Sequence, residues 1–270
     1  MSFIKQISSI SNPFIKKIVS LNKANTRREE NLTLVEGWKE IQHATNGKNI
    51  IKSLIYCPQI IPLEKVLALR KNEKVEIVEI DQKTYNHIAY RDSNGGVLAL
   101  IEIIPTGFAD LTLEKNSLIL VLDNIEKPGN IGALLRTADA AGIKTVVFSD
   151  NQTDIYSPNV IRSSLGAIFT LNVIDSTANE CIAWLQKNRI KIFSTYLFTE
   201  NNYLDVNFKE SSAIILGSEA NGIQNVWKEN SDELIKIPMF GSIDSMNVSV
   251  SAGIVIFEAV RQRKFSKNFC

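Results

Sequence analysis

Five polar side chains in the second half of the sequence could do chemistry. They comprise two amides, one guanidinium, one carboxylate and one hydroxyl, and they belong to Asn130, Arg136, Glu219, Ser245 and Asn247. Arg136 interrupts a run of apolar residues with helical spacing, so we expect it on the buried side of a helix, where a guanidinium needs an acidic partner. Glu219 is the natural candidate for that partner. Such a pair could belong to a site, or it could only tie two loops together.

Several common kinds of site are disfavoured by what the sequence lacks. No G-x-G-x-x-G follows the first strand of either half and no G-x-x-x-x-G-K-S/T is present, which argues against a dinucleotide oxidoreductase and a P-loop ATPase. His43 and His87 both lie in the first half, so a histidine-based triad or metal centre among the five residues is not expected. Cys57, Cys181 and Cys270 are scattered without paired spacing, so we predict neither a disulfide framework nor a metal site.

Three strand-to-helix junctions must position the five residues. Apolar strands are expected at 118–122, 214–216 and 234–237, and each runs into a polar turn that contains glycine and then into a helix. In parallel sheets, ligands bind beyond the carboxyl ends of the strands. Because all three polar turns would lie at such ends, we expect them to form one shared site.

The third junction has two interpretations. Apolar residues recur at helical spacing from Val248 to Val260, so we predict a helix whose first turn presents unpaired backbone N–H groups. Asn247 could serve only as the cap of that helix, with Ser249 or Ser251 covering the first turn. The turn holds more small polar residues than a cap requires, however, which favours a binding role as well.

The length of 270 residues and the pattern of elements indicate an α/β protein with two domains. Strands alternate with helices over residues 1–105, which predicts a small α/β sandwich with a mainly parallel or mixed sheet. Residues 106–116 form a link interrupted by glycine and charged residues. The alternation restarts over 117–270, where wholly apolar strands are typical of a mainly parallel sheet that is covered on both faces.

Charge is unevenly distributed along the chain. The net charge of +1 argues against a wholly basic coat for nucleic acid, yet residues 1 to 28 include six basic residues and no acidic one. This local positive field could hold phosphates, and the residues that we expect to bind RNA are Lys16, Lys17, Arg27 and Arg28. Lys16 and Lys17 lie on the polar side of a predicted helix, whereas Arg27 and Arg28 are expected in a loop. A solvated helix face is the alternative explanation.

No segment predicts export or membrane insertion. The first residues lack the order of a signal peptide, and the longest mainly apolar stretch, from Val248 to Val260, is too short to span a bilayer. We therefore expect the protein in the cytoplasm.

The three junctions together resemble the three motifs of the SpoU (TrmH-like) RNA 2′-O-ribose methyltransferases of the SPOUT class. The motifs are N-x-G-A-x-x-R at 130–136, L-G-S-E-x-x-G at 216–222 and I-P-M-x-G-x-x-x-S-M-N-V-S-V at 237–250. They occur in this order and far apart, and the resemblance covers about residues 115 to 263. The first block is similar, through weaker cues at 11–13 and 35–37, to the substrate-binding domain of that family, which looks like a small ribosomal RNA-binding protein.

The resemblance implies a dimeric domain with a trefoil knot that binds S-adenosylmethionine in the knot. Knots are nearly absent from proteins, so no periodicity predicts one. By position in the motifs, the cofactor would be lined by Leu216, Gly217, Ile237, Met239 and Met246. The residues Asn130, Arg136, Glu219, Ser245 and Asn247 occupy the positions of the catalytic and substrate residues of the family.

The implied reaction suits these residue types. A ribose 2′-hydroxyl must lose its proton as it attacks a sulfonium methyl group, so the site must position the oxygen and stabilise negative charge. A guanidinium with a pKa above ~12 is a poor base, so we expect Arg136 to clamp the target phosphate, oriented by Glu219 and supplied by the partner subunit. The residue that removes the proton from the 2′-hydroxyl is left open, and we expect the reaction to need no metal. Ribosomal RNA is the expected substrate; transfer RNA methylation and a non-catalytic RNA-binding or ribosome-assembly role are the alternatives.

Overall fold

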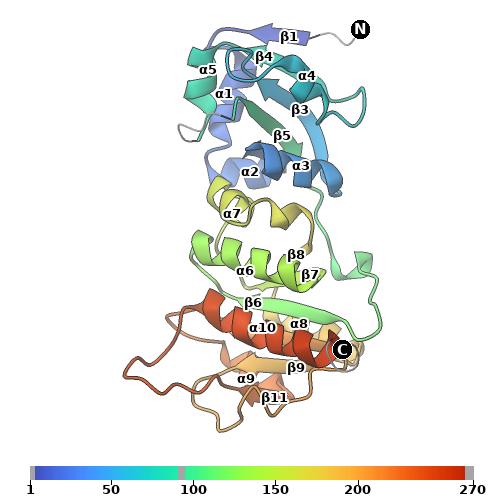
Figure 1. Cartoon of the computed structure of the whole chain (residues 1–270), viewed down its shortest axis with the longest axis vertical. Coiled ribbons are helices and arrows are strands. Elements are labelled where there is room, and N and C mark those ends of the chain that lie inside the picture. The colour runs from blue at the N-terminus through green and yellow to red at the C-terminus, as the bar shows by residue number, and fades with distance from the viewer. Residues whose placement is uncertain (1–3, 91–94, 265–270) are drawn as a thin grey trace, which may run out of the picture. The chain divides into compact units, whose positions relative to one another are not determined.

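The computed structural model describes residues 4–90 and 95–264, which form two compact units. The first unit holds the chain up to Ile104 together with Asp154–Thr170, and the second holds Pro105–Thr153 and the chain from Leu171 onward. Each unit contains one sheet with helices, so the α/β class predicted from the sequence is confirmed (Figure 1). The domain limits drawn from the sequence, 1–105 and 117–270 around a link, do not anticipate the grouping of residues 154–170 with the first unit.

The first unit is built on a mixed five-stranded sheet in the order β1-β4-β3-β5-β2. Its strands are β1 (Ile4–Ile7), β2 (Leu32–Glu36), β3 (Ile50–Tyr56), β4 (Glu76–Ile80) and β5 (Val97–Glu102). Its helices are α1 (Pro13–Ser20), α2 (Ala24–Glu30), α3 (Trp38–Asn46), α4 (Leu63–Leu67), α5 (Gln82–Ile88) and α7 (Pro158–Ser163), with a 3₁₀ turn η2 (Ala167–Phe169). Strand β5 is antiparallel to both of its neighbours, whereas β1, β4 and β3 run parallel.

Helix α1 begins as its sequence predicts. The Asn12 side chain accepts a hydrogen bond from the backbone N–H of Phe14 at 2.9 Å, and Pro13 occupies the first turn, where its missing N–H costs nothing. Ile15 and Ile18 are buried in the core of the first unit. The basic residues Lys16, Lys17 and Arg28 are exposed, and Lys17 forms a surface ion pair with Glu30 at 2.8 Å.

Arg27 lies in a different environment from the one that the sequence predicted. It is part of helix α2 and not of a loop, and only 7% of its surface is exposed. Its Nε donates to the Asp154 carboxylate at 2.7 Å, and its guanidinium also bonds the carbonyl of Leu21. Together with a hydrogen bond from Thr33 Oγ1 to the Tyr156 carbonyl, this pair holds the segment 154–170 in the first unit. We therefore assign Arg27 a structural role and remove it from the RNA contacts.

The second unit is built on a six-stranded sheet in the order β11-β9-β10-β6-β7-β8, in which every paired strand is parallel. Its strands are β6 (Leu118–Asp123), β7 (Thr145–Ser149), β8 (Asn172–Ser176), β9 (Lys191–Thr195), β10 (Ser212–Gly217) and β11 (Glu233–Ile235). Its helices are η1 (Phe108–Asp110), α6 (Pro128–Ala141), α8 (Ala178–Lys187), α9 (Asn225–Asn230) and α10 (Val248–Lys264). The mainly parallel sheet predicted from the sequence is confirmed.

Both faces of this sheet are covered, which explains its wholly apolar central strands. Ile119 and Val121 of β6 pack with α8 and α9, so Leu120 and Leu122 face the opposite side. Helices α6 and α10 pack against each other, and α10 also contacts β10 (Figure 1). The carboxyl edge of the sheet, where the polar turns follow the strands, is left for the site.

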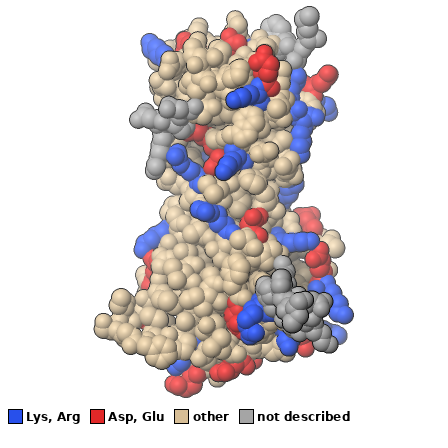
Figure 2. Space-filling model, in the orientation of Figure 1, with Lys and Arg blue, Asp and Glu red and all other residues tan. Residues whose placement is uncertain are grey.

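Three further features concern the cysteines, the apolar character of the helices and the surface charge. Cys57 and Cys181 are free and buried, and Cys270 lies outside the described residues. No helix among residues 4–90 and 95–264 has the length and apolar character to cross a membrane. Basic and acidic side chains are interspersed over the visible face, in keeping with the net charge of +1 (Figure 2). The trefoil knot stays a prediction.

We expect Arg27→Met to destabilise the protein, because it leaves the Asp154 carboxylate, only 12% exposed, without its cation. Removing one partner of a buried ion pair typically costs about 3–5 kcal/mol. The free energy of unfolding, measured in urea by circular dichroism, should fall by about 3 kcal/mol. The exposed Lys16→Met is the matched control and should change it by less than about 0.5 kcal/mol. Equal stability of the two variants would contradict the role given to Arg27.

Candidate active site

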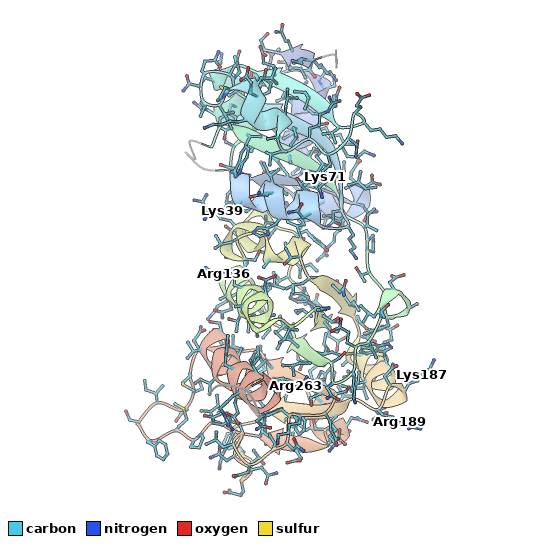
Figure 3. The ribbon with its side chains drawn as sticks, turned by 45° about the vertical axis from the view of Figure 1, so that its right-hand side comes forward. Lys39, Lys71, Arg136, Lys187, Arg189 and Arg263 are labelled. Atoms are coloured by element: carbon cyan, nitrogen blue, oxygen red, sulfur yellow. The ribbon has the colours of Figure 1, made fainter. Side chains whose placement is uncertain are left out.

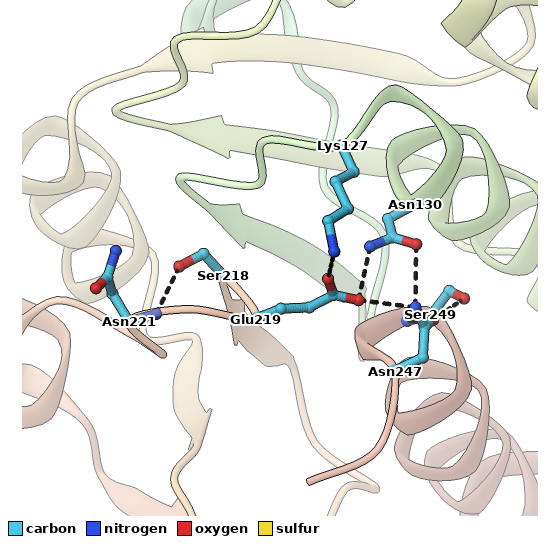
Figure 4. A network of polar contacts seen from close by, with 7 residues as sticks. All are labelled: Lys127, Asn130, Ser218, Glu219, Asn221, Asn247 and Ser249. Carbon is cyan, nitrogen blue, oxygen red and sulfur yellow. Dashed lines mark hydrogen bonds and ion pairs between the residues drawn. The ribbon is translucent and has the colours of Figure 1, made fainter.

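The carboxylate of Glu219 is the centre of a polar cluster at the carboxyl edge of the second sheet (Figure 4). Its Oε1 accepts hydrogen bonds from Asn130 Nδ2 at 2.9 Å and from Asn247 Nδ2 at 2.8 Å. Asn247 Nδ2 also lies 3.2 Å from Asn130 Oδ1, and Lys127 Nζ forms an ion pair with Glu219 Oε2. The three junctions predicted to share a site therefore do converge.

Asn247 caps helix α10 and also belongs to the polar cluster. Its Oδ1 accepts from the backbone N–H of Ser249 at 3.0 Å and from Ser249 Oγ at 2.6 Å, so it caps helix α10. Its Nδ2 donates to Glu219 and Asn130 at the same time. The backbone N–H of Val248 also bonds Glu219. The carboxylate thus sits at the start of α10, where the unpaired N–H groups of a helix favour negative charge.

Glu219 is held in its charged form by these neighbours. The hydrogen bond from Lys127, followed by the bond from Asn130, holds the pKa of the Glu219 carboxyl below its ordinary value. An ionised carboxylate only accepts hydrogen bonds. Both amides must therefore turn their N–H₂ groups toward it, which fixes the orientation of Asn130 and Asn247.

The loop that carries Glu219 depends on Gly217 at the end of β10. The loop folds back on itself, because the N–H of Ser218 bonds the Gly222 carbonyl at 3.1 Å and the N–H of Gly222 bonds the Ser218 carbonyl at 2.9 Å. A Cβ atom on Gly217 would lie 2.1 Å from the carbonyl carbon of Gly222. Only glycine fits there. Leu216, the residue before it, is buried in the sheet.

The loop between β11 and α10 carries the other predicted site residues. Ile237 and Met246 are half-buried, and Met239 is 37% exposed. Ser245 is exposed, and its side chain makes no hydrogen bond within the part of the chain that the structure describes. The structure therefore brings Asn130, Glu219 and Asn247 together, but it does not join Ser245 to their cluster.

Arg136 does not pair with Glu219, so the predicted ion pair is wrong. Arg136 is exposed on α6, and no hydrogen bond or ion pair of its side chain occurs among residues 4–90 and 95–264 (Figure 3). The buried stripe of α6 is formed by Ile131, Gly132, Leu134, Leu135, Ala138 and Ala141. Because a helix turns by about 100° per residue, position 136 lies off this stripe. Arg136 interrupts the apolar run because it lies on the outer, exposed face of the helix.

Lys127 takes the place that the sequence assigned to Arg136, and sequence reasoning missed it. It precedes Pro128 at the start of α6, which brings its side chain to the Glu219 carboxylate. The one available signal was a basic residue directly before the proline that begins the helix of the first motif. No cluster of three or more histidine, cysteine or acidic side chains suited to a metal ion occurs among the residues that the structure describes.

Known families match both parts of the chain. Residues 117–257 match the SpoU rRNA Methylase family, and residues 12–99 match the MRM3-like substrate binding domain. The 23S rRNA (guanosine(2553)-2′-O)-methyltransferase RlmP of Bacillus subtilis (strain 168) is 25% identical over 94% of this chain and 98% of its own. The 23S rRNA (guanosine-2′-O-)-methyltransferase RlmB of Neisseria meningitidis serogroup B is 33% identical over 74% of this chain and 82% of its own.

The fold also matches a solved structure over nearly its whole length. The crystal structure of an AdoMet-bound rRNA methyltransferase from Sinorhizobium meliloti has a TM-score of 0.87 and 28% identity, and the match covers 96% of this chain and 98% of that one. The family match alone spans more than half of the sequence and contains all three of the converging motifs. The chain therefore belongs to the SpoU rRNA Methylase family.

Proposed function

We propose that this protein is an S-adenosylmethionine-dependent enzyme that methylates a ribose 2′-hydroxyl of ribosomal RNA. The observation that carries the proposal is the convergence of Asn130, Glu219 and Asn247 at the start of α10. The relatives RlmP and RlmB are named for 2′-O-methylation of guanosine in 23S rRNA, and we extend ribosomal RNA as the substrate class to this chain. An assembled polar cluster disfavours a non-catalytic role.

The residues around the cluster fit S-adenosylmethionine. Gly217 lets the loop from Ser218 to Gly222 fold back closely against the end of β10, and the loop after β11 leaves Met239 37% exposed. We propose that Leu216 and Gly217 hold the cofactor through their backbone, and that Ile237, Met239 and Met246 hold it through their side chains. The bound cofactor would supply a methyl group on a positively charged sulfonium.

The chain's own residues would position the ribose and stabilise charge. The 2′-oxygen becomes more negative as its proton leaves, so donors fixed in advance lower the barrier. Glu219 fixes the amide of Asn130, whose second Nδ2 hydrogen makes no other bond among the described residues, whereas both Nδ2 hydrogens of Asn247 bond Glu219 and Asn130. Lys127 balances the charge of Glu219. We propose that the exposed hydroxyl of Ser245 contacts the substrate from the neighbouring loop.

Arg136 suits the target phosphate and would come from a second subunit. Its guanidinium is exposed and has no acidic partner among the described residues, so it is available for an RNA phosphate. It does not join the Glu219 cluster of its own chain, which supports a site completed by the partner. We propose a homodimer on these grounds.

The exposed face of α10 supports the same dimer. Val250 is 52% exposed and Phe257 48%, and with the half-buried Ile254 they form a stripe at helical spacing. Val248 and Val260 face the core instead. An exposed apolar stripe beside a site is typical of an interface, and twofold symmetry would bring two copies of it together.

The first unit would bind the RNA outside the target nucleotide. We propose contacts from the exposed Lys16, Lys17 and Arg28, and the surface pair of Lys17 with Glu30 is weak enough to open for a phosphate.

Purified protein, labelled S-adenosylmethionine and separate pools of ribosomal and transfer RNA test the function directly. If only the transfer RNA pool is labelled, ribosomal RNA is overturned as the substrate class. A cytoplasmic location stays a prediction.

Gly217→Ala should weaken cofactor binding, because the added Cβ forces the loop from Ser218 to Gly222 away from the end of β10. We expect the Kd for S-adenosylmethionine, measured by calorimetry, to rise by at least about tenfold, which corresponds to about 1.4 kcal/mol. Gly107→Ala is the matched control, since its Cβ would meet only Asp110 Oδ2 at an ordinary 3.7 Å. An unchanged Kd in Gly217→Ala would remove this glycine from the cofactor site.

Lys127→Met should move the acid limb of the pH profile of kcat/KM to higher pH. The Lys127 bond is the largest cause of the lowered pKa of Glu219, so losing it raises that pKa. Activity that needs the carboxylate is lost as pH falls through the pKa of Glu219, and a raised pKa brings this loss at higher pH. Lys127→Arg keeps the cation and should keep the limb in place. Superimposable profiles for Lys127→Met and wild type would contradict this role.

Arg136→Ala should lower methyl transfer by about 100-fold or more and leave cofactor affinity unchanged. Subunit mixing then tests whether Arg136 acts across the dimer. We expect Arg136→Ala and Asn130→Ala to be inactive separately, whereas an equal mixture of re-associated chains should regain about one quarter of the wild-type sites. No recovery in mixtures that are shown to exchange subunits would mean that Arg136 acts within its own chain. Unchanged turnover of Arg136→Ala would remove it from the mechanism.

A further inference from the structure

A second polar cluster lies at the far end of the loop that carries Glu219. Gln224 directly follows that loop, and its backbone N–H donates to Asp123 Oδ2 at 2.7 Å. Its side-chain Nε2 donates to Asp123 Oδ1 at 2.8 Å and to Asp150 Oδ2 at 3.0 Å. One side chain therefore bridges carboxylates at the ends of two neighbouring strands, β6 and β7.

The Asp123 carboxylate depends on these donors. It is completely buried, and within the described part of the chain its hydrogen-bond partners are Gln224 and Ser149 Oγ, the latter at 3.2 Å. No cation contacts it among the residues that the structure describes. Burying a carboxyl group costs free energy unless hydrogen bonds replace its water. The two donors of Gln224 supply most of that replacement.

The chain turns sharply at the ends of the two strands, β6 and β7, that position these carboxylates. Asn124 and Asp150, which directly follow β6 and β7, have φ values of +50° and +49°. Asparagine and aspartate adopt this left-handed conformation more readily than most residues. The N–H of Asn124 bonds the Ser149 carbonyl, and the N–H of Asp150 bonds the Ser176 carbonyl, both at 2.9 Å. Each bond ties the end of one strand to the end of the next, which fixes the backbone beside Asp123 and at Asp150.

Gln224 does not have the ordinary role of its position. It is the N-cap of α9, where serine, threonine, aspartate or asparagine normally accepts a hydrogen bond from the first turn. The Gln224 side chain makes no such cap bond and reaches back to β6 and β7 instead. The Gln224 side chain therefore ties the end of the loop before α9 to β6 and β7 and does not cap the helix.

We propose that Gln224 is a positioning residue for cofactor binding, which bridges Asp123 and Asp150 and so holds the loop Gly217–Ile223 in the shape that receives the methyl donor. The loop is fixed at its start by the parallel pairing of β10 with β6 and at Glu219 by the site cluster. Gln224 fixes its end. The part of this proposal that concerns the donor rests on the proposed function, whereas the part that concerns the loop does not.

Three variants of the full chain test the proposal. Gln224→Ala removes the bridge, whereas Gln224→Arg keeps donors that reach both carboxylates. Asn230→Ala is the matched control on α9, because within the described part of the chain the Asn230 side chain bonds only Val226 of its own helix and Gln186. The measurements are the Kd for S-adenosylmethionine by calorimetry, the steady-state kinetics with RNA, and the amide hydrogen exchange of residues 217–223 without ligand.

For Gln224→Ala we expect faster exchange of the loop and a Kd about tenfold higher, in line with the loss of hydrogen bonds to charged groups. KM for the cofactor should rise while kcat at saturating cofactor stays near wild type, which a general loss of folded protein would not produce. Gln224→Arg should restore both exchange and affinity, and Asn230→Ala should leave them unchanged.

The outcomes separate this proposal from the proposed function. If the wild type binds the cofactor and Gln224→Ala matches it in loop exchange, Kd and KM, the positioning role is overturned. If the wild type does not bind the cofactor, the proposed function fails, and the exchange of residues 217–223 alone decides whether Gln224 holds the loop. Failure of Gln224→Arg to restore the loop would show that the contacts to the carboxylates are not what matters.

Discussion

The site of the second unit depends on one charged group, the carboxylate of Glu219, at the start of a helix. Segments from two helices and one loop meet there because this anion accepts hydrogen bonds from each of them: Lys127 and Asn130 on α6, and Asn247 and Val248 at the start of α10. Ordering irregular backbone costs conformational entropy, about 1–2 kcal/mol per residue. The hydrogen bonds to this shared acceptor offset part of that cost, which favours convergence of the polar turns on Glu219.

Strand order explains why the three junctions differ in length. β10 and β6 are neighbours in register, with Gly217 opposite Asp123, so their turns start side by side and can be short. β11 lies at the edge of the sheet, beyond β9, so its connection must pass the ends of β9 and β10 before Asn247 reaches Asn130. With strands about 4.8 Å apart, that path crosses three spacings, roughly 14 Å. A long polar loop before α10 is therefore a geometric requirement of this topology.

Local pattern predicted the parallel sheet, the α10 cap and the convergence of Asn130, Glu219 and Asn247, because each follows from neighbouring residues or from where strands end. It failed where a partner is distant in sequence. Arg27 lies in a short, highly charged helix without apolar periodicity, and its burial is decided by Asp154, which is 127 residues away. The Asp123–Gln224 bridge was equally invisible, since an aspartate at a strand end looks the same whether it is solvated or buried.

The exposed position of Arg136, away from Glu219, matters for the proposed mechanism. Because Lys127 already neutralises Glu219, the guanidinium of Arg136 has no acidic group of the described chain to satisfy it. Had the two residues paired, binding a phosphate would first have required breaking that pair. An Arg136 left exposed loses no ion pair when it contacts RNA, whereas the Glu219 cluster stays intact beside it. In the proposed mechanism, one cation therefore holds the site together and the other is left for the substrate.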